Sequence, residues 1–291
     1  MVFSGSATAL VTPFDKNGNV NYFALKNLIE YQIASGTKAL VILGTTGEAS
    51  TLLDEERTKI IKFCVCEVSK RVPVIIGTGS NCTKTAIKYS IEAENLGADA
   101  VLVVTPYYNK CNQMGLYEHF KSIAKAIKIP VILYNVPSRT GVNILPQTVL
   151  KLSKIKNIVG IKEANSNIAQ HIELLNLLPK SFAVYSGDDL MAFPCIMIGA
   201  KGVISVTANA YPELVSNMCN FAILGDTQNA KRLHNYLYKI NKVLFEDVNP
   251  IPIKSYLGLI GLKVGNTRLP LTKPSLQLLK ILKEVKEYYE N

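Results

Sequence analysis

The chain has 291 residues, of which 48% are hydrophobic and 19% charged, and this composition predicts a globular protein and excludes a disordered one. Its net charge of +10 comes from 27 Lys and 5 Arg scattered along the chain, whereas nucleic-acid readers rely on clustered cations and Arg forks, so we expect no nucleic-acid role. No apolar run reaches the roughly 18 residues of a membrane span, and residues 1–12 lack a signal-peptide pattern, which predicts a cytoplasmic protein with no membrane partner.

Eight short apolar runs, rich in β-branched residues, alternate with longer amphipathic stretches. Near-continuous apolar runs are typical of parallel strands that are buried on both faces. Stretches such as 54–69, 84–96 and 116–127 repeat apolar residues at intervals of three and four, which predicts helices between the strands. The predicted strands are 7–11, 39–43, 72–76, 100–104, 131–134, 158–161, 182–185 and 203–206.

Eight such units within about 225 residues favour an α/β fold of the closed (βα)8 TIM-barrel type over a doubly wound sheet, which is usually smaller. The phosphate fingerprint of a doubly wound sheet is also missing, because its nearest candidate, residues 77–82, lacks the third Gly. The strand runs stop after Tyr211, and residues 214–245, 253–262 and 274–289 have helical patterns. We therefore predict a catalytic barrel domain at residues 1–225 and a C-terminal helical extension at residues 226–291.

Polar side chains follow several predicted strands, at the end where parallel barrels carry their active sites. The second strand is followed by the turn 44–48, whose amides and Thr hydroxyls suit a carboxylate or a phosphate. Asp188 and Asp189 follow the seventh strand, and we interpret them as caps of the next helix rather than as metal ligands. The three His and six Cys show no zinc-ligand spacing, so we expect no metal and no cofactor.

Lys162 is the leading candidate for covalent chemistry. It follows the run 158–161, and the alternation of side chains along a strand places it on the same face as Gly160 and Ile158. If that face lines the barrel interior, the amine is desolvated, which favours the neutral form that attacks carbonyl groups. A strand-end lysine more often reaches into solvent, but reactive side chains at the neighbouring strand ends favour a site here.

Tyr108, Tyr134 and Arg139 lie at or just beyond the ends of the fourth and fifth predicted strands. A phenol aimed into the barrel mouth can relay a proton between substrate and solvent, whereas strand-end tyrosines more often serve in packing. The Arg139 guanidinium could hold a substrate carboxylate in a bidentate fork, and the alternative is a surface ion pair.

Five motifs after the predicted strands together resemble those of the dihydrodipicolinate synthase family, within the pyruvate-dependent class I aldolases that also include N-acetylneuraminate lyase. The likeness covers nearly the whole chain and falls in family order. The resemblance implies a condensation of pyruvate with aspartate 4-semialdehyde, which leads to diaminopimelate and lysine, and it implies no metal. The motifs are GTTGE at 44–48, TPYYN at 105–109, YNVPSRTG at 134–141, GIKEA at 160–164 and GVISVT at 202–207.

The resemblance also implies a role for each site residue. Lys162 would form the Schiff base with pyruvate, Tyr134 would donate and accept protons, and Thr45 with Tyr108 would complete a relay to solvent. Tyr108 would come from a neighbouring subunit, so activity would need at least a dimer, and a homotetramer built as a dimer of dimers is expected. The implied substrate contacts are Thr46 and the backbone of Ile204 for the pyruvate carboxylate, Gly187 for the shape of the pocket, and Arg139 for the carboxylate of the semialdehyde.

Two alternatives to the synthase remain open. A pyruvate-releasing sugar-acid lyase would resemble this chain at the lysine and the tyrosine, but such lyases generally lack Arg in the segment that holds Arg139. A barrel that only senses an oxo-acid is disfavoured by the presence of Lys162, Tyr134, Tyr108 and Thr45.

The resemblance further implies an effector pocket. Lysine-inhibited relatives typically have His at the positions of Asp54 and Arg57 and Glu at the position of Thr85. A neutral Thr85 beside a cationic Arg57 removes the acid that would pair with the lysine ammonium, so we expect weak or absent inhibition by lysine. The residues implied to line this pocket are Ala49, Ser50, Asp54, Arg57, Asn81, Thr85 and Tyr107.

Overall fold

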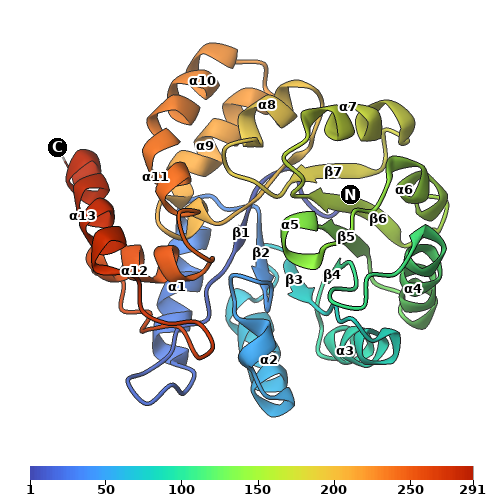
Figure 1. Cartoon of the computed structure of the whole chain (residues 1–291), viewed down its shortest axis with the longest axis horizontal. Helices are drawn as coiled ribbons and strands as arrows, with labels where there is room; N and C mark the ends of the chain where they lie inside the picture. The colour runs from blue at the N-terminus through green and yellow to red at the C-terminus, as the bar shows by residue number, and fades with distance from the viewer. Residues whose placement is uncertain (291) are drawn as a thin grey trace.

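The computed structural model describes residues 1–290, and its eight parallel strands form a closed barrel in chain order with helices around the outside (Figure 1). Each strand lies within two residues of its predicted bounds, so the predicted TIM barrel is confirmed. The strands are β1 (Gly5–Ala9), β2 (Ala39–Ile42), β3 (Val74–Gly77), β4 (Ala100–Val104), β5 (Val131–Asn135), β6 (Ile158–Glu163), β7 (Ala183–Ser186) and β8 (Gly202–Ser205).

The helices that follow the strands include the three that the apolar spacing predicted. The barrel helices are α1 (Tyr22–Ala34), α2 (Asp54–Val68), α3 (Thr83–Asn95), α4 (Gln113–Ala126), α5 (Pro137–Thr140), α6 (Pro146–Leu152), α7 (Ile168–Leu177), α8 (Ala192–Met197) and α9 (Pro212–Ile223), with short 3₁₀ turns at Ala49–Thr51 and Thr207–Asn209. None of the helices within residues 1–290 is long and apolar enough to cross a bilayer.

The predicted helical stretch 214–245 is broken into α9, α10 (Thr227–Tyr236) and α11 (Tyr238–Val243). The first break follows from a left-handed Gly225 (φ +83°) and from Asp226, whose side chain accepts a hydrogen bond from the Asn229 amide and caps α10. The predicted domain boundary between residues 225 and 226 lies at this turn and stays a prediction. Two further helices, α12 (Ile251–Leu259) and α13 (Leu276–Glu290), complete the C-terminal extension, and α13 packs on α11 and α12.

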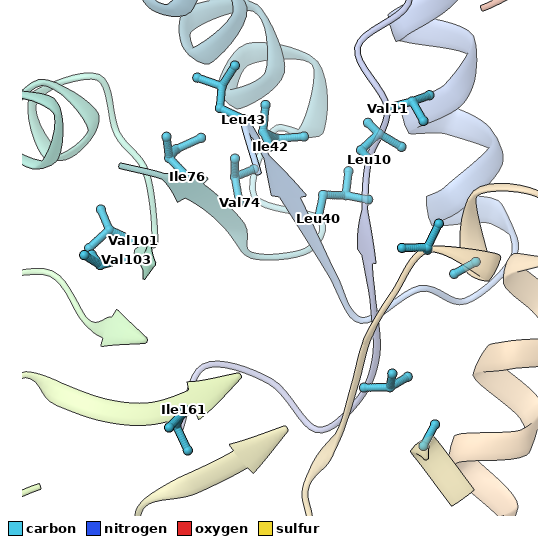
Figure 2. Close-up of a cluster of buried hydrophobic side chains, with 14 of the residues drawn as sticks. Leu10, Val11, Leu40, Ile42, Leu43, Val74, Ile76, Val101, Val103 and Ile161 are labelled. Atoms are coloured by element: carbon cyan, nitrogen blue, oxygen red, sulfur yellow. The ribbon is translucent and has the colours of Figure 1, made fainter. Parts of the chain in front are cut away.

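The strands separate two hydrophobic clusters. Alternate residues point outward to the helices, and Leu40, Ile42 and Ile76 of this outer cluster are drawn in Figure 2. The inner cluster fills the barrel, and its floor is closed where the Tyr185 ring stacks on Phe3 with ring centroids 4.2 Å apart. The barrel interior is therefore a packed core rather than a pore.

A register shift between β5 and β6 decides which side chains of β6 face inward. Val131 pairs with Ile158, but Ile132 pairs with Gly160, so β6 carries one extra residue at this point. Ile158 belongs to the outer cluster, whereas Val159 packs on the inner one. The prediction that Ile158 shares the face of Lys162 is therefore wrong, and the prediction for Gly160 is confirmed, since its register partner Ile132 belongs to the inner cluster.

Candidate active site

A cavity of about 590 Å³ opens at the carboxyl ends of the strands. It brings together six of the eight residues implied for catalysis and substrate binding, contributed by the ends of β2, β5, β6 and β7. The six residues are Thr45, Thr46, Tyr134, Arg139, Lys162 and Gly187.

Lys162 lies within this cavity, where its side chain is 6% exposed. It pairs in register with Tyr134 of β5, and its Nζ lies 4.5 Å from the centre of the Tyr134 ring. Among residues 1–290 no carboxylate forms an ion pair with this amine. The amine and the phenol ring therefore lie side by side in the same cavity.

Gly187 makes room for the Lys162 side chain. A Cβ at position 187 would lie 2.6 Å from the Ala164 Cβ and 3.0 Å from the Lys162 Cε. A larger residue would therefore displace the lysine from its position over Tyr134. This steric conflict is the physical reason why a glycine is expected at position 187 to shape the pocket.

Thr45 and Thr46 lie in a turn that the backbone builds from unusual conformations. Leu43 and Glu48, at the two ends of the turn, both have left-handed φ angles, of 58° and 54°. The Thr46 hydroxyl oxygen accepts a hydrogen bond from Asn249 Nδ2 at 2.9 Å, and this leaves the hydroxyl proton free to be donated. Thr46 is thus poised to donate to an anionic oxygen in the cavity.

The turn is anchored by a buried ion pair that the sequence reasoning missed. Lys254 of α12 donates to Glu48 Oε1 at 2.8 Å, and the two side chains are 2% and 1% exposed. The other donors of Lys254 reach the carbonyl oxygens of Thr12 and Asn266, both at 2.9 Å, so the ammonium is completely hydrogen-bonded. Burial lowers the pKa of Lys254 to about 8, although the Glu48 carboxylate acts in the opposite direction.

Arg139 reaches the cavity from α5, directly after β5. Its Nη2 donates to the Asn249 carbonyl oxygen at 3.2 Å, so Asn249 contacts Thr46 through its side chain and Arg139 through its backbone. The segment 245–249, which precedes α12, lines the same cavity. The C-terminal extension therefore forms one wall of the site, which no local pattern in the sequence predicted.

Tyr108 and Ile204 do not line the cavity of their own chain. Tyr108 is 89% exposed with a left-handed φ of 72°, and Ile204 is buried in the inner cluster. The structure thus holds Tyr108 out in solvent, away from Lys162.

Comparisons with known proteins show which family the chain belongs to. A family model described as "Dihydrodipicolinate synthetase family" matches residues 2–287. The chain belongs to this family.

Three relatives show how closely the chain follows the dihydrodipicolinate synthetase family. The 4-hydroxy-tetrahydrodipicolinate synthase of Acetivibrio thermocellus is 50% identical over 288 residues, which cover 99% of this chain and 98% of the relative. The crystal structure of dihydrodipicolinate synthase from Aquifex aeolicus is 46% identical, with a TM-score of 0.97 and coverage of 99% and 98%. The chloride-inhibited enzyme of Acinetobacter baumannii, solved with pyruvate, is 46% identical, with a TM-score of 0.97 and coverage of 100% and 99%.

In this member of the dihydrodipicolinate synthetase family, Asp188 and Asp189 do not cap a helix, and that prediction is wrong. Helix α8 begins after Met191 with no side-chain cap. The buried Asp189 instead accepts hydrogen bonds from the Ser205 hydroxyl and from the backbone amides of Val206 and Thr207, and it joins the ends of β7 and β8. Residues 1–290 contain no group of three or more His, Cys, Asp or Glu placed to hold a metal.

Glu163, which follows Lys162, points to the helical side of the barrel. Its carboxylate accepts hydrogen bonds from Asn135 Nδ2, the Asn165 amide and Gln170 Nε2, at 2.8 to 3.0 Å. Burial raises the pKa of Glu163 to about 7, and the donors around it oppose that change. These contacts hold the end of β6, and so the backbone that carries Lys162, against β5 and α7.

A second cavity of about 450 Å³ adjoins the first and shares Thr45, Tyr134 and Arg139 with it. We call it the side cavity. Asp54 and Asn81 do not line it; the Asp54 carboxylate accepts hydrogen bonds from Lys88 and Tyr89 instead. The implied effector residues that do line it are Ala49, Ser50, Arg57, Thr85 and Tyr107.

Proposed function

We propose that this chain condenses pyruvate with L-aspartate 4-semialdehyde through a Schiff base on Lys162, giving 4-hydroxy-tetrahydrodipicolinate. This is the first committed step toward diaminopimelate and lysine. The observation that carries the proposal is the buried Lys162 amine, held over the Tyr134 ring in a cavity that also presents Thr46 and Arg139. The family and the relatives named above support the same activity.

The geometry supports a sequence of steps in which each residue has one task. The Lys162 amine adds to the keto carbon of pyruvate, and loss of water gives a protonated imine that withdraws electrons from the methyl group. The methyl group then loses a proton, and the resulting enamine carbon attacks the aldehyde carbon of the second substrate. The amino group of that substrate then replaces Lys162 at the imine carbon, which closes the ring and releases the free lysine amine. Tyr134 carries protons in these steps, while the Thr46 hydroxyl donates to the pyruvate carboxylate.

The direct test is to incubate the protein with pyruvate, reduce it with borohydride, and map the adduct by peptide mass spectrometry. A reduced pyruvate adduct on Lys162 is expected, and an adduct on another lysine or none at all would contradict the proposal. The natural acceptor is identified separately, on untreated protein, by comparing turnover of aspartate 4-semialdehyde with that of N-acetylmannosamine. Preference for N-acetylmannosamine would identify a sugar-acid lyase instead.

Arg139 is expected to determine binding of the second substrate only. Replacing Arg139 by Ala removes the charged fork that receives the semialdehyde carboxylate, so the KM for the semialdehyde should rise about 10- to 100-fold. Trapping of pyruvate on Lys162 should be unchanged, because the pyruvate carboxylate binds at Thr46. Steady-state kinetics with each substrate varied in turn measures both effects, and an equal rise in the KM for pyruvate would exclude this division of roles.

We further propose a cytoplasmic homotetramer, a dimer of dimers, in which Tyr108 enters the cavity of the neighbouring subunit. Its 89% exposure and left-handed backbone in the single chain support this, because a large aromatic side chain held in solvent gains from burial in a partner. Sedimentation velocity measures the assembly state, and a monomer with full activity would refute the shared site.

Replacing Tyr108 by Phe should lower kcat about 100-fold, since it removes one member of the proton relay. The melting temperature should change little, because the hydroxyl has no partner within the described chain. Co-expression of Tyr108→Phe with Lys162→Ala provides the control. A mixed dimer combines one intact lysine with one intact tyrosine, so activity should return, and its failure to return would place Tyr108 outside the partner's cavity.

A further inference from the structure

Two pairs of residues lie where β5 and β6 end, one pair on each side of the strands. Tyr134 pairs in register with Lys162, and both line the cavity. The next residue of each strand, Asn135 and Glu163, also pair in register, on the opposite side, toward the helices. Both are completely buried, and Asn135 Nδ2 donates to the two carboxylate oxygens of Glu163 at 2.9 and 3.0 Å. A hydrogen-bonded pair thus lies directly behind the reactive pair.

The alignment of this end of β6 depends on contacts made after the register shift in the strand. The shift occurs at Val131, and a slip of one residue turns every side chain of a strand to the opposite face. A slip at this end would therefore carry the Lys162 amine out of the cavity. Two contacts beyond the shift hold the observed register, namely the side-chain bond of Asn135 to Glu163 and the Ala164 amide, which donates to the Asn135 carbonyl oxygen at 2.9 Å.

The Glu163 carboxylate is surrounded by neutral donors. Besides Asn135, it accepts from Gln170 Nε2 at 3.0 Å and from the Asn165 amide at 2.8 Å. Within residues 1–290 no Lys, Arg or His forms an ion pair with it. Hydrogen bonds to an ionised acceptor are roughly twice as strong as those between neutral groups. The carboxylate therefore binds Asn135 more strongly than a neutral side chain of the same size would.

Glu163 is also joined to other walls of the cavity. Asn143, which follows the helix that carries Arg139, accepts from Asn135 Nδ2 at 2.7 Å. The Glu163 carbonyl oxygen accepts from the Gly187 amide at 2.7 Å. Contacts of this one residue thus reach the end of β5, the segment after α5 and the end of β7.

We propose that Glu163 is a positioning residue for the Schiff-base chemistry. Its carboxylate, by binding Asn135, fixes the Lys162 amine beside the Tyr134 ring. The inference rests on the proposed function, and it adds a residue that does not itself line the described cavity. A displacement of reacting groups by about 1 Å can lower a rate about 100-fold. Loss of the bond should therefore slow imine formation, while the pyruvate carboxylate still binds at Thr46.

The first test is Glu163→Gln, which keeps the size of the side chain but points an NH2 group at the donors of Asn135 and Gln170. At about pH 8 the wild-type carboxylate is ionised, because burial raises its pKa to about 7. There, kcat and the initial rate of borohydride trapping with pyruvate should fall about 10- to 100-fold in the variant. The KM for pyruvate should change by less than about threefold. The final yield of adduct should equal that of the wild type, whereas a merely structural loss would lower the yield.

Glu94→Gln is the matched control for removal of a carboxylate that accepts hydrogen bonds. Glu94 accepts from the backbone amides of Lys128 and Ile129, which precede β5 at the end of the barrel away from the cavity. This variant should react with pyruvate at the rate of the wild type.

An exchange of the two side chains tests whether the bond itself matters. Asn135→Asp combined with Glu163→Gln moves the carboxylate from β6 to β5. Half-turns of the Asn143 and Gln170 amides then give every N–H of this group an acceptor. The trapping rate and kcat should return to within about threefold of the wild type. If Glu163→Gln does not fold, the exchange variant decides alone, since recovery of fold and rate supports the proposal and failure to recover either overturns it.

Wild-type protein treated in parallel separates this inference from the proposed function. Absence of a pyruvate adduct on wild-type Lys162 would contradict the proposed function, and the positioning role with it. A wild-type adduct together with an unchanged trapping rate in folded Glu163→Gln would overturn the positioning role alone. A folded exchange variant that stays as slow as Glu163→Gln would do the same.

Discussion

Replacement of Lys162 by Ala is expected to reduce turnover by about 10³-fold or more, which corresponds to about 4 kcal/mol of lost transition-state stabilisation. The reason is chemical, since without the amine no imine forms and the pyruvate methyl group is not acidified. The same variant should give no pyruvate adduct after borohydride reduction. Steady-state kinetics and peptide mass spectrometry on the same preparation measure both effects.

Lys162→Arg is the matched control for charge. A guanidinium keeps the positive charge in the cavity but stays protonated and cannot form an imine. If Lys162 acted only by attracting anionic substrates, Lys162→Arg would retain much of the activity, whereas covalent catalysis predicts that both variants are equally inactive. Retention of turnover within tenfold of the wild type in either variant would refute the Schiff-base mechanism.

Replacement of Lys254 by Met is expected to destabilise the folded protein by about 3–5 kcal/mol, the usual cost of removing one partner from a buried ion pair. The change leaves the Glu48 carboxylate buried without its cation, and it leaves the carbonyl oxygens of Thr12 and Asn266 without a donor. Because Glu48 ends the turn that carries Thr46, the KM for pyruvate should rise as well. Chemical denaturation at fixed protein concentration measures the stability change, and kinetics measures the second effect.

A double variant isolates the electrostatic part of this prediction. Glu48→Gln combined with Lys254→Met removes both charges, so it should recover a substantial share of the lost stability. Lys70→Met provides the comparison at the surface, where the pair with Asp99 is 68% and 28% exposed and should contribute less than about 1 kcal/mol. A Lys254→Met protein within 1 kcal/mol of the wild type would show that the buried pair does not anchor the turn.

The barrel could be predicted from the sequence because its strands are buried on both faces. Each strand then contains a nearly continuous apolar run, and the polar residues of the site come directly after that run. Lys162 and Glu163, for example, come directly after the run 158–161. Since parallel strands bring their carboxyl ends to one edge, motifs far apart in sequence met in one cavity as expected. The local sequence pattern was sufficient to predict a site residue wherever that residue lies on a strand or in the turn directly after it.

The features that the sequence did not predict all depend on contacts between distant residues. The pair of Glu48 with Lys254 joins positions 206 residues apart, and the contact of Thr46 with Asn249 joins positions 203 apart. The only local sign of the Glu48–Lys254 pair was a lysine within an apolar helix. The extra residue of β6 was hidden for a related reason, since a bulge is defined by the pairing of two strands and leaves the hydrophobic pattern of each strand almost unchanged.

The contacts of Glu48 also determine when, during synthesis of the chain, the turn that carries Thr46 can be held in place. A chain emerges from the ribosome beginning with its N-terminus, so the turn that carries Thr45 and Thr46 is among the first parts of the site to be made. Its two anchors, Lys254 and the amide of Arg268, are among the last. A nascent chain that already has all eight strands thus contains Lys162 and Tyr134, but its Thr46 turn stays unsecured until residues 254 and 268 have been made.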